Sequence, residues 1–389
     1  MNEVELYAHL TKACTRGYSA MRAVTRLEPI GSAGDAVFPP TYSKDLPNGK
    51  SEATYAWFER GATERAVILD SVQSQANRFE LALLTAMRRG DLALPLVETA
   101  IEGYGKITAL DAPHRVSDAI FRDCLLGGVE FAKSDTGKAL REAREGNAAA
   151  FFEHSPNVLI FGTWDSQSGG GTNTAKVARA LVSEIVGFGA TPTARTSSRI
   201  DPLGIKSSAK VYWIKKTKVW DNAKFSGSQG GNPSEINHGN VTPTVNTTTG
   251  GVTFREALQT TVLSFTQLRK LSFGKPGEGD LAARAVLAAL ALYAVELFWE
   301  DGFLLRSRCQ LLPETRPAWE LIGSTAKERQ ALEFDAATVR KALDVAVAAA
   351  RKHGFAWKTE PVVLTPSAKL TELIRRSDAS VGEAVGEEA

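Results

Sequence analysis

An apolar run of alanine, leucine and valine over residues 285–295 is the feature that most constrains the fold of this chain. The run is bracketed by Arg284 and Glu296, and it is well short of the ~20 residues that a membrane span needs. A segment that is apolar on every side must be buried among other elements of a core. We therefore expect a buried helix over about 279–299 and no association with a membrane.

The composition limits the classes of partner and of site. The chain has 389 residues, of which 43% are apolar and 23% charged, as in ordinary globular proteins. Lys and Arg number 46 against 44 Asp and Glu, so a nucleic-acid partner must be indicated by a local patch. Cys14, Cys124 and Cys309 lack the spacing of a metal site or of a disulfide framework. The N-terminus lacks the basic start of a signal peptide, so we expect a cytoplasmic protein without a cofactor or a metal.

Two segments show the period-two alternation of a half-buried strand, and each carries arginines on its polar face. The segments and their arginines are 18–30 with Arg22 and Arg26, and 303–312 with Arg306 and Arg308. Arginines on one sheet surface can hold a phosphate backbone, although a solvated sheet face would show the same pattern.

Other periodic patterns predict further elements. Apolar spacings of three and four predict an amphipathic helix over 65–89 and another over about 335–352. The short apolar run 157–162 predicts a buried strand, followed by a helix through Val186. The small, acidic residues 377–389 predict a disordered tail.

Positive charge is concentrated between residues 195 and 224, where aromatic residues are interleaved. The basic residues are Arg195, Arg199, Lys206, Lys210, Lys215, Lys216, Lys218 and Lys224, and the aromatic ones are Tyr212, Trp213 and Trp220. Residues 225–253 contain no Lys or Arg and six glycines, which is typical of an excursion from the core. This patch, with the two basic strand faces, favours a nucleic-acid partner.

Known enzyme motifs are mostly missing. The glycine-rich segment 168–176 lacks the Gly-Lys-Ser/Thr that places a lysine on phosphates. His114 and Asp118 have a spacing found in metal sites, but an ion pair or a cap contact explains it more often. Asp35 lies in the loop 31–52, where a carboxylate can position a ribose hydroxyl or a metal for RNA cleavage. A turn-forming Asp beside a glycine explains Asp35 as well.

Several longer stretches occur in one order and carry a resemblance to a known family. They are AVFPPTY (36–42), ILDSVQSQANRFE (68–80), HRVSDAIFRD (114–123), TSSRIDPLGI (196–205), INHGNVTPTV (236–245) and GGVTFREA (250–257). Together they closely resemble the RAMP-type backbone subunit, in the Cas-seven family, of the type I-G (formerly I-U) CRISPR effector complex. The similarity covers about residues 15–315.

The resemblance implies an α+β fold with a ferredoxin-like (RRM-like) palm, large insertions and a projecting thumb hairpin. It predicts a single elaborated domain over 1–376. The palm core is expected at about 15–30, 65–90, 157–190 and 280–312, the thumb-like insertion at about 206–255, and the tail at 377–389. The first and last palm strands would then be neighbours.

The function implied is that of a non-catalytic scaffold in prokaryotic antiviral defence. Many copies would form a helical oligomer along one CRISPR RNA (crRNA) in a type I Cascade surveillance complex and would present the spacer for pairing to target DNA. The other partners implied are a large subunit, a Cas-five/Cas-six-type subunit and a recruited helicase-nuclease.

The resemblance also selects site residues. The pattern Ser74, Gln75 and Arg78 looks like the helix motif with which related subunits hold guide phosphates, although Asp70 and an apolar run stand where other subtypes carry basic residues. The predicted RNA-binding residues are Arg22, Arg26, Ser74, Gln75, Asn77, Arg78, His114, Arg115, Arg199, Lys206, Lys210, Lys215, Lys216, Arg306 and Arg308. Val241 and Val245 are the predicted thumb wedge, since an apolar tip interrupts base stacking.

Two other functions stay open at this point. A metal-dependent, RNA-cleaving backbone subunit as in type III effectors would use Asp35. A stand-alone RNA-binding regulator would form a one-to-one complex with its RNA.

Overall fold

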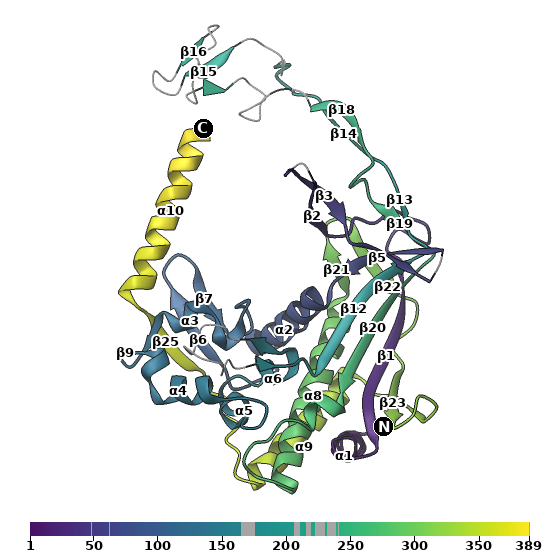
Figure 1. Ribbon diagram of the computed structural model, residues 1–389, viewed down its shortest axis with the longest axis vertical. Coiled ribbons are helices and arrows are strands. Elements are labelled where there is room, and N and C mark those ends of the chain that lie inside the picture. Colours follow the sequence, from purple (N-terminus) through teal and green to yellow (C-terminus); the bar gives the residue numbers. More distant parts are fainter. Residues whose placement is uncertain are drawn as a thin grey trace. The chain divides into compact units, whose positions relative to one another are not determined.

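A computed structural model of the chain (Figure 1) describes residues 1–47, 49–61, 63–164, 176–205, 211–214, 219–221, 230–231, 239 and 241–388. Contacts divide the chain into two compact units, where the sequence predicted one elaborated domain over 1–376. The first unit comprises Met1–Pro40, Ala56–Ala190 and Phe254–Ser367, and the second comprises Thr41–Tyr55, Thr191–Thr253 and Ala368–Ala389.

The main sheet of the first unit is antiparallel throughout, and its order is β21-β22-β1-β20-β12-β5-β4, with β23 and β24 added beside β1. The bounds are β1 (Tyr18–Pro29), β4 (Trp57–Arg60), β5 (Glu64–Asp70), β12 (Leu181–Phe188), β20 (Glu256–Ser264), β21 (Phe303–Arg306), β22 (Cys309–Pro313), β23 (Trp319–Gly323) and β24 (Arg329–Leu332). In β1, Met21, Ala23 and Leu27 are buried while Val24 and Arg26 are exposed, so the predicted alternation is confirmed.

Four helices of the first unit pack on one another (Figure 1): α1 (Glu3–Ala13), α2 (Val72–Arg89), α8 (Glu278–Asp301) and α9 (Ala336–Lys352). Helices α1, α2 and α8 contact the main sheet, and α9 packs on α8 and α1. The predictions for 279–299 and 335–352 are thereby confirmed. Among the described residues, α8 is the helix long and apolar enough to cross a membrane, but 83% of its apolar window is buried inside the structure. Its alanines allow neighbouring elements to approach closely on all sides, as the core of a globular unit requires.

A smaller sheet has the order β7-β6-β25-β8-β9. Its strands are β6 (Val97–Ile101), β7 (Gly105–Thr108), β8 (Cys124–Leu126), β9 (Val129–Glu130) and β25 (Val362–Pro366). Short helices lie between and after these strands in the chain, namely η1 (Arg115–Ser117), α3 (Ala119–Arg122), η2 (Phe131–Lys133), α4 (Asp135–Glu142), α5 (Ala149–His154), α6 (Asn157–Phe161) and, farther on, α7 (Phe265–Leu268). The two-residue strands β10 (Thr163–Trp164) and β11 (Lys176–Val177) pair with each other.

The second unit consists of small antiparallel ladders and a C-terminal helix. The elements are β2 (Thr41–Asp45), β3 (Ser51–Tyr55), β13 (Thr191–Pro192), β14 (Arg195–Arg199), β15 (Tyr212–Ile214), β16 (Val219–Asp221), β17 (Gly230–Gly231), β18 (Val241–Asn246), β19 (Val252–Thr253) and α10 (Ala368–Glu388). The loop predicted over 31–52 thus contains the β2–β3 hairpin. Helix α10 continues through the tail that we expected to be disordered.

Three predicted elements differ from the structure. Residues 65–89 form strand β5 and then helix α2, because Ala66 and Val67 pair with both β12 and β4 and Ser71 caps the helix. The run 157–162 is helix α6 rather than a strand, ended by Gly162 at φ 83°. The helix predicted through Val186 is strand β12, whose residues alternate between buried and accessible over most of its length. Short apolar runs suit both buried helices and buried strands, so neighbouring elements decide.

The segment 303–312 is a hairpin rather than one strand. β21 and β22 are antiparallel, with Arg306 opposite Cys309, and the turn falls at Ser307 and Arg308. Arg308 has φ 58°, a left-handed conformation that a tight turn of this kind requires. Phe303, Leu305, Cys309 and Leu311 are still buried, so the inward pattern was predicted correctly except at Ser307, which is exposed.

Candidate nucleic-acid interface

The first pair of predicted arginines lies on the accessible face of β1, and a carboxylate accompanies each of them. Arg22 Nη2 is 2.7 Å from Glu320 Oε2, and Arg26 Nη1 is 3.0 Å from Glu256 Oε2. The Arg22 side chain is 29% exposed and that of Arg26 is 59% exposed. A phosphate would compete with Glu256 for Arg26 more easily than with Glu320 for Arg22, because an exposed pair is weak.

The second pair lies at the turn of the β21–β22 hairpin, and both arginines are exposed. The guanidinium of Arg308 stacks on the ring of Phe38 at 4.1 Å from the centroid. β22 is a neighbour of β1, as predicted, but the pairing covers only the end of β1 from Leu27 to Pro29. The hairpin turn therefore lies beside the 30–38 segment rather than beside Arg22.

Gln75 does not reach the surface of helix α2. It has no exposed surface, and its Nε2 donates to Asp70 Oδ2 at 2.6 Å. Its Oε1 accepts from Gln259 Nε2 at 2.7 Å and from Ser183 Oγ at 3.0 Å. Every polar atom of this side chain is thus engaged in a buried network that ties α2 to β12 and β20. The prediction of direct phosphate contact is contradicted for Gln75 by this burial.

Arg78, one turn farther along α2, is mostly structural as well. Its Nε donates to Asp70 Oδ2 at 2.9 Å, and its Nη1 and Nη2 donate to the carbonyl oxygens of Leu304 and Leu305. The side chain is 21% exposed. Arg78 thereby neutralises the buried Asp70 and holds β21 against α2. Asp70, which stands where other subtypes carry a basic residue, is explained by its ion pair with Arg78.

Two other predicted RNA-binding residues of α2 are accessible, namely Ser74 of the helix motif and Asn77. Asn77 is exposed and Ser74 is half-buried near the N-terminus of α2. Ser71 Oγ accepts a hydrogen bond from the Ser74 backbone N–H, which caps the helix. Ser74 and Asn77 are therefore the predicted RNA-binding residues of α2 whose side chains are open to direct contact.

Arg115 is the second predicted contact that the structure buries. It is 7% exposed, and its Nε and Nη2 each donate to a carboxylate oxygen of Glu80 at 2.7 Å. Its Nη1 donates to the carbonyl of Gly162 at 3.0 Å, and Asn157 completes the coordination of Glu80. Burial raises the pKa of the Glu80 carboxyl, while Arg115 acts in the opposite direction. Direct RNA contact is thus contradicted for Arg115, whereas the adjacent His114 is exposed.

Strand β18 lies within the thumb-like insertion predicted at about 206–255, and its partner β14 precedes those bounds. β14 and β18 pair from Arg195–Asn246 to Arg199–Val241, and all five residues of β14 are exposed. Val245 is 67% exposed. The lysines Lys206, Lys210, Lys215 and Lys216 lie outside the described residues, and for Val241 only the backbone is described.

Asp35 is part of a local turn. Its Oδ1 accepts a hydrogen bond from the Ala36 backbone N–H at 2.8 Å, and its own N–H donates to the Ser32 carbonyl. Ser32 itself has φ 105°. This is the geometry of a turn-forming Asp, and within the described residues no group of His, Cys, Asp or Glu is suited to hold a metal.

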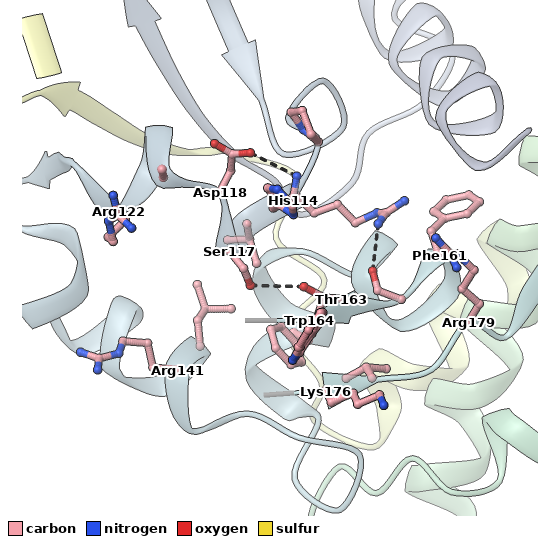
Figure 2. Close-up of a pocket in the computed structure, with 18 of the residues that line it drawn as sticks. His114, Ser117, Asp118, Arg122, Arg141, Phe161, Thr163, Trp164, Lys176 and Arg179 are labelled. Carbon is pink, nitrogen blue, oxygen red and sulfur yellow. Dashed lines mark hydrogen bonds between the residues drawn. The ribbon is translucent and has the colours of Figure 1, made fainter. Parts of the chain in front are cut away.

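The sequence analysis missed one basic site, a pocket in the first unit of about 1210 Å³ (Figure 2). It lies between the 113–122 segment, α4 and the β10–β11 pair, and its floor includes Phe131, Leu140 and Phe151. Basic side chains outnumber carboxylates in the lining. They are His114, Arg115, Arg122, Arg141, Lys176 and Arg179, against Asp118. The signal available in the sequence was Trp164, which precedes the glycine-rich segment, and Lys176, which ends it.

Comparisons with known proteins bear on the function of this interface. Residues 21–192 match the model of the family described as CRISPR-associated protein GSU0053 (Cas_GSU0053). Among solved structures, a Csc2 crystal structure from Thermofilum pendens is similar at 13% identity and a TM-score of 0.24, covering 96% of this chain and 80% of that one. The search among curated proteins found no match.

Proposed function

We propose that this chain is a non-catalytic, crRNA-binding backbone subunit of a type I CRISPR Cascade complex, of subtype I-G. The observation that carries the proposal is the match of residues 21–192 to a CRISPR-associated family model. The stretches that resemble the Cas-seven backbone subunit extend the argument on both sides of that segment, to about residues 15–315.

The strand order of the main sheet supports a ferredoxin-like palm. In that fold the sheet order is fourth, first, third, second, with a helix after the first strand and another after the third. The order β22-β1-β20-β12, with α2 following β1 and α8 following β20 in the chain, agrees with it. Strands β5 and β4 extend the sheet beyond β12.

The β14–β18 ribbon supports a thumb. It is inserted between β12 and β20, whose ends are adjacent through the Phe188–Glu256 pair. Its exposed side chains are arginines, hydroxyls and Val245. Hydroxyl and guanidinium groups contact sugar and phosphate without reading sequence, as a protein that accepts any spacer requires.

The accessible cations give the proposed RNA contacts. On this proposal Arg26, Arg199, Arg306 and Arg308 hold phosphates, together with Ser74, Asn77, His114 and the lysines between 206 and 216. Other copies of the chain, the remaining Cascade subunits and target DNA are the proposed partners in a prokaryotic cytoplasm. The balanced total charge suits copies that must stack against one another.

The local hydrogen bonds of Asp35 favour a scaffold over a nuclease. Its carboxylate is engaged in its own turn. Replacement of Asp35 by Ala is expected to leave RNA binding and RNA integrity unchanged. Loss of RNA cleavage in that variant would instead establish the type III-like activity.

Native mass spectrometry of the chain, co-expressed with a CRISPR array and the neighbouring proteins, tests the proposal by counting copies per RNA. Several copies on one guide are expected. A one-to-one complex would support a stand-alone RNA-binding regulator, and a chain without RNA would overturn the proposal.

A further inference from the structure

The pocket beneath the β10–β11 pair combines a ring, cations and an apolar floor. Trp164 is 67% exposed on β10, and Lys176 is its directly opposite partner on β11. Directly opposite residues in an antiparallel pair extend from the same side of the ladder. A flat ring and an ammonium group therefore lie side by side at the rim of the pocket, as Figure 2 shows.

The lining of the pocket contains an arginine, Arg179, with one buried nitrogen that has no hydrogen-bond partner. The Nε of Arg179 is buried, and no described residue accepts a hydrogen bond from it. Burial and the nearby Arg115 both lower the pKa of Arg179, although Glu80 opposes them. An anion bound beside Arg179 would offset the repulsion between its guanidinium and that of Arg115.

The one carboxylate in the lining is already engaged. Asp118 accepts hydrogen bonds from the backbone N–H groups of His114, at 3.1 Å, and of Ile120, at 3.0 Å. Asp118 caps α3. Within the described residues, no ion pair joins it to Lys176 or Arg179. Arg122 is paired with Asp123, outside the lining. The pocket as a whole is therefore suited to an anion.

The size and the apolar floor argue for a ligand larger than a simple anion. A volume of about 1210 Å³ exceeds the roughly 300–1,000 Å³ that is usual for small-molecule sites. Phe131, Leu140 and Phe151 line it with apolar surface. Aromatic rings at a basic groove are the platforms on which unpaired bases stack in single-stranded nucleic-acid sites.

We infer that this pocket binds an unpaired nucleotide of a single-stranded nucleic acid, with its base stacked on Trp164 and its phosphate held by Lys176 and Arg179. The inference deepens the proposed function and rests on it for the identity of the strand as RNA. The pocket includes His114, already a proposed RNA contact, and adds Trp164, Lys176 and Arg179 to the residues that would hold the same strand.

Fluorescence anisotropy with a 5′-labelled eight-residue oligouridylate, added to the purified full chain, tests the site. Trp164→Ala is expected to weaken binding about tenfold, the usual effect of removing one stacking platform. Trp164→Phe, which keeps a ring, should retain most of the affinity. Lys176→Ala and Arg179→Gln should each weaken binding several-fold.

Two exposed residues outside the pocket give matched controls. Tyr104→Ala removes another exposed ring, and Lys133→Ala removes another exposed lysine. Both controls should bind as the parent does. Equal affinity of parent, Trp164→Ala and Lys176→Ala would overturn the inference, as would an equal loss in the two controls.

Photo-crosslinking of a 4-thiouridine oligonucleotide locates the contact directly. An adduct on a peptide that contains Trp164 or Lys176 is expected, and adducts confined to residues 195–246 would overturn the inference. A deoxythymidylate oligomer and uridine 5′-monophosphate serve as further probes, which distinguish RNA from DNA and a strand from a free nucleotide.

The outcomes for the pocket and for the scaffold are separable. If Trp164→Ala binds the oligouridylate as the parent does while several copies still assemble on one guide, the inference about the pocket is wrong and the proposed function is retained. If the parent binds the oligouridylate through Trp164 but never assembles on a guide, the proposed function fails and the pocket stands.

Discussion

At the scale of single residues, polar side chains near a predicted site are of two kinds. Some are exposed and can bind a partner, and others are buried and stabilise the fold. Gln75 and Asn77 are two positions apart on α2, yet Gln75 is fully buried and Asn77 is exposed. The difference follows from helical geometry, because residues two apart point about 200° away from each other. Both residues looked equally suited to RNA in the sequence.

Gln75→Ala is expected to destabilise the chain by about 2–4 kcal/mol, because Asp70, Ser183 and Gln259 would lose a buried hydrogen-bond partner. Asn77→Ala should change stability by less than about 0.5 kcal/mol. Urea denaturation monitored by circular dichroism measures both. Unchanged stability in Gln75→Ala would contradict the structural role.

Glu184 offers a test of burial through pH. It lies on β12, opposite Thr260, and burial raises the pKa of its carboxyl. The folded chain therefore keeps this proton to higher pH than the unfolded chain does, and the contribution to stability is lost as pH rises above the unfolded value of ~4.3. Glu184→Gln, which mimics the protonated form, should unfold at a higher temperature than the parent at pH 7.

Thermal unfolding of Glu184→Gln and of the parent at several pH values measures this effect. The advantage of the variant should shrink as pH falls toward about 4, where the parent becomes protonated as well. Glu130→Gln is the control, since that carboxylate is exposed and paired with Lys133. An advantage that stays constant with pH would exclude burial of Glu184 as its cause.

At the scale of elements, the β14–β18 ribbon lacks a buried face along the whole of strand β14. All residues of β14 are exposed, and Ser197 Oγ shares a hydrogen bond with Thr244 Oγ1 across the pair. A ribbon of this kind contributes little to a core, because it removes little apolar surface from water. Its arginines are available for a partner.

Arg199→Ala is expected to weaken guide binding equally for all spacer sequences and to reduce the slope of log affinity against log salt by about one. Anisotropy titrations with two unrelated guides, between low and high salt, provide the measurement. Arg376→Ala, an exposed arginine paired with Glu372 on α10, is the control. A loss that depends on spacer sequence would contradict backbone recognition.

At the scale of the whole molecule, the insertion 191–253 leaves and rejoins the main sheet at neighbouring positions. β12 and β20 are paired up to Phe188 and Glu256, and the small β13–β19 ladder follows directly. Removal of the ribbon therefore need not disturb the pairing of the two strands. The fold of the first unit and the proposed RNA assembly can be tested apart.

Replacement of residues 195–246 by a short Gly/Ser linker should leave cooperative unfolding intact and change the thermal midpoint by less than about 4 °C, roughly the effect of 1 kcal/mol. The same variant should lose multi-copy assembly on the guide in native mass spectrometry. Retention of the parent's copy number would contradict a thumb role for the ribbon. Loss of cooperative unfolding would show that the insertion belongs to the folding unit.

The sequence by itself determined the elements whose patterns are periodic and long. The alternation of β1 and the burial of α8 and α9 follow from side-chain order alone, since a strand repeats every two residues and a helix every 3.6. The family resemblance and the basic segment likewise required no structure. Short apolar runs were ambiguous, and α6 and β12 were assigned to the wrong type for that reason.

Only the tertiary structure decided which polar residues are buried and where a pocket opens. Gln75 meets Ser183 and Gln259, 108 and 184 residues away, and Arg78 meets Leu304, 226 residues away. A buried polar group must be hydrogen-bonded. Such distant partners therefore decide whether a glutamine or arginine is buried in a core or remains exposed and able to contact phosphate. Local sequence does not contain that information.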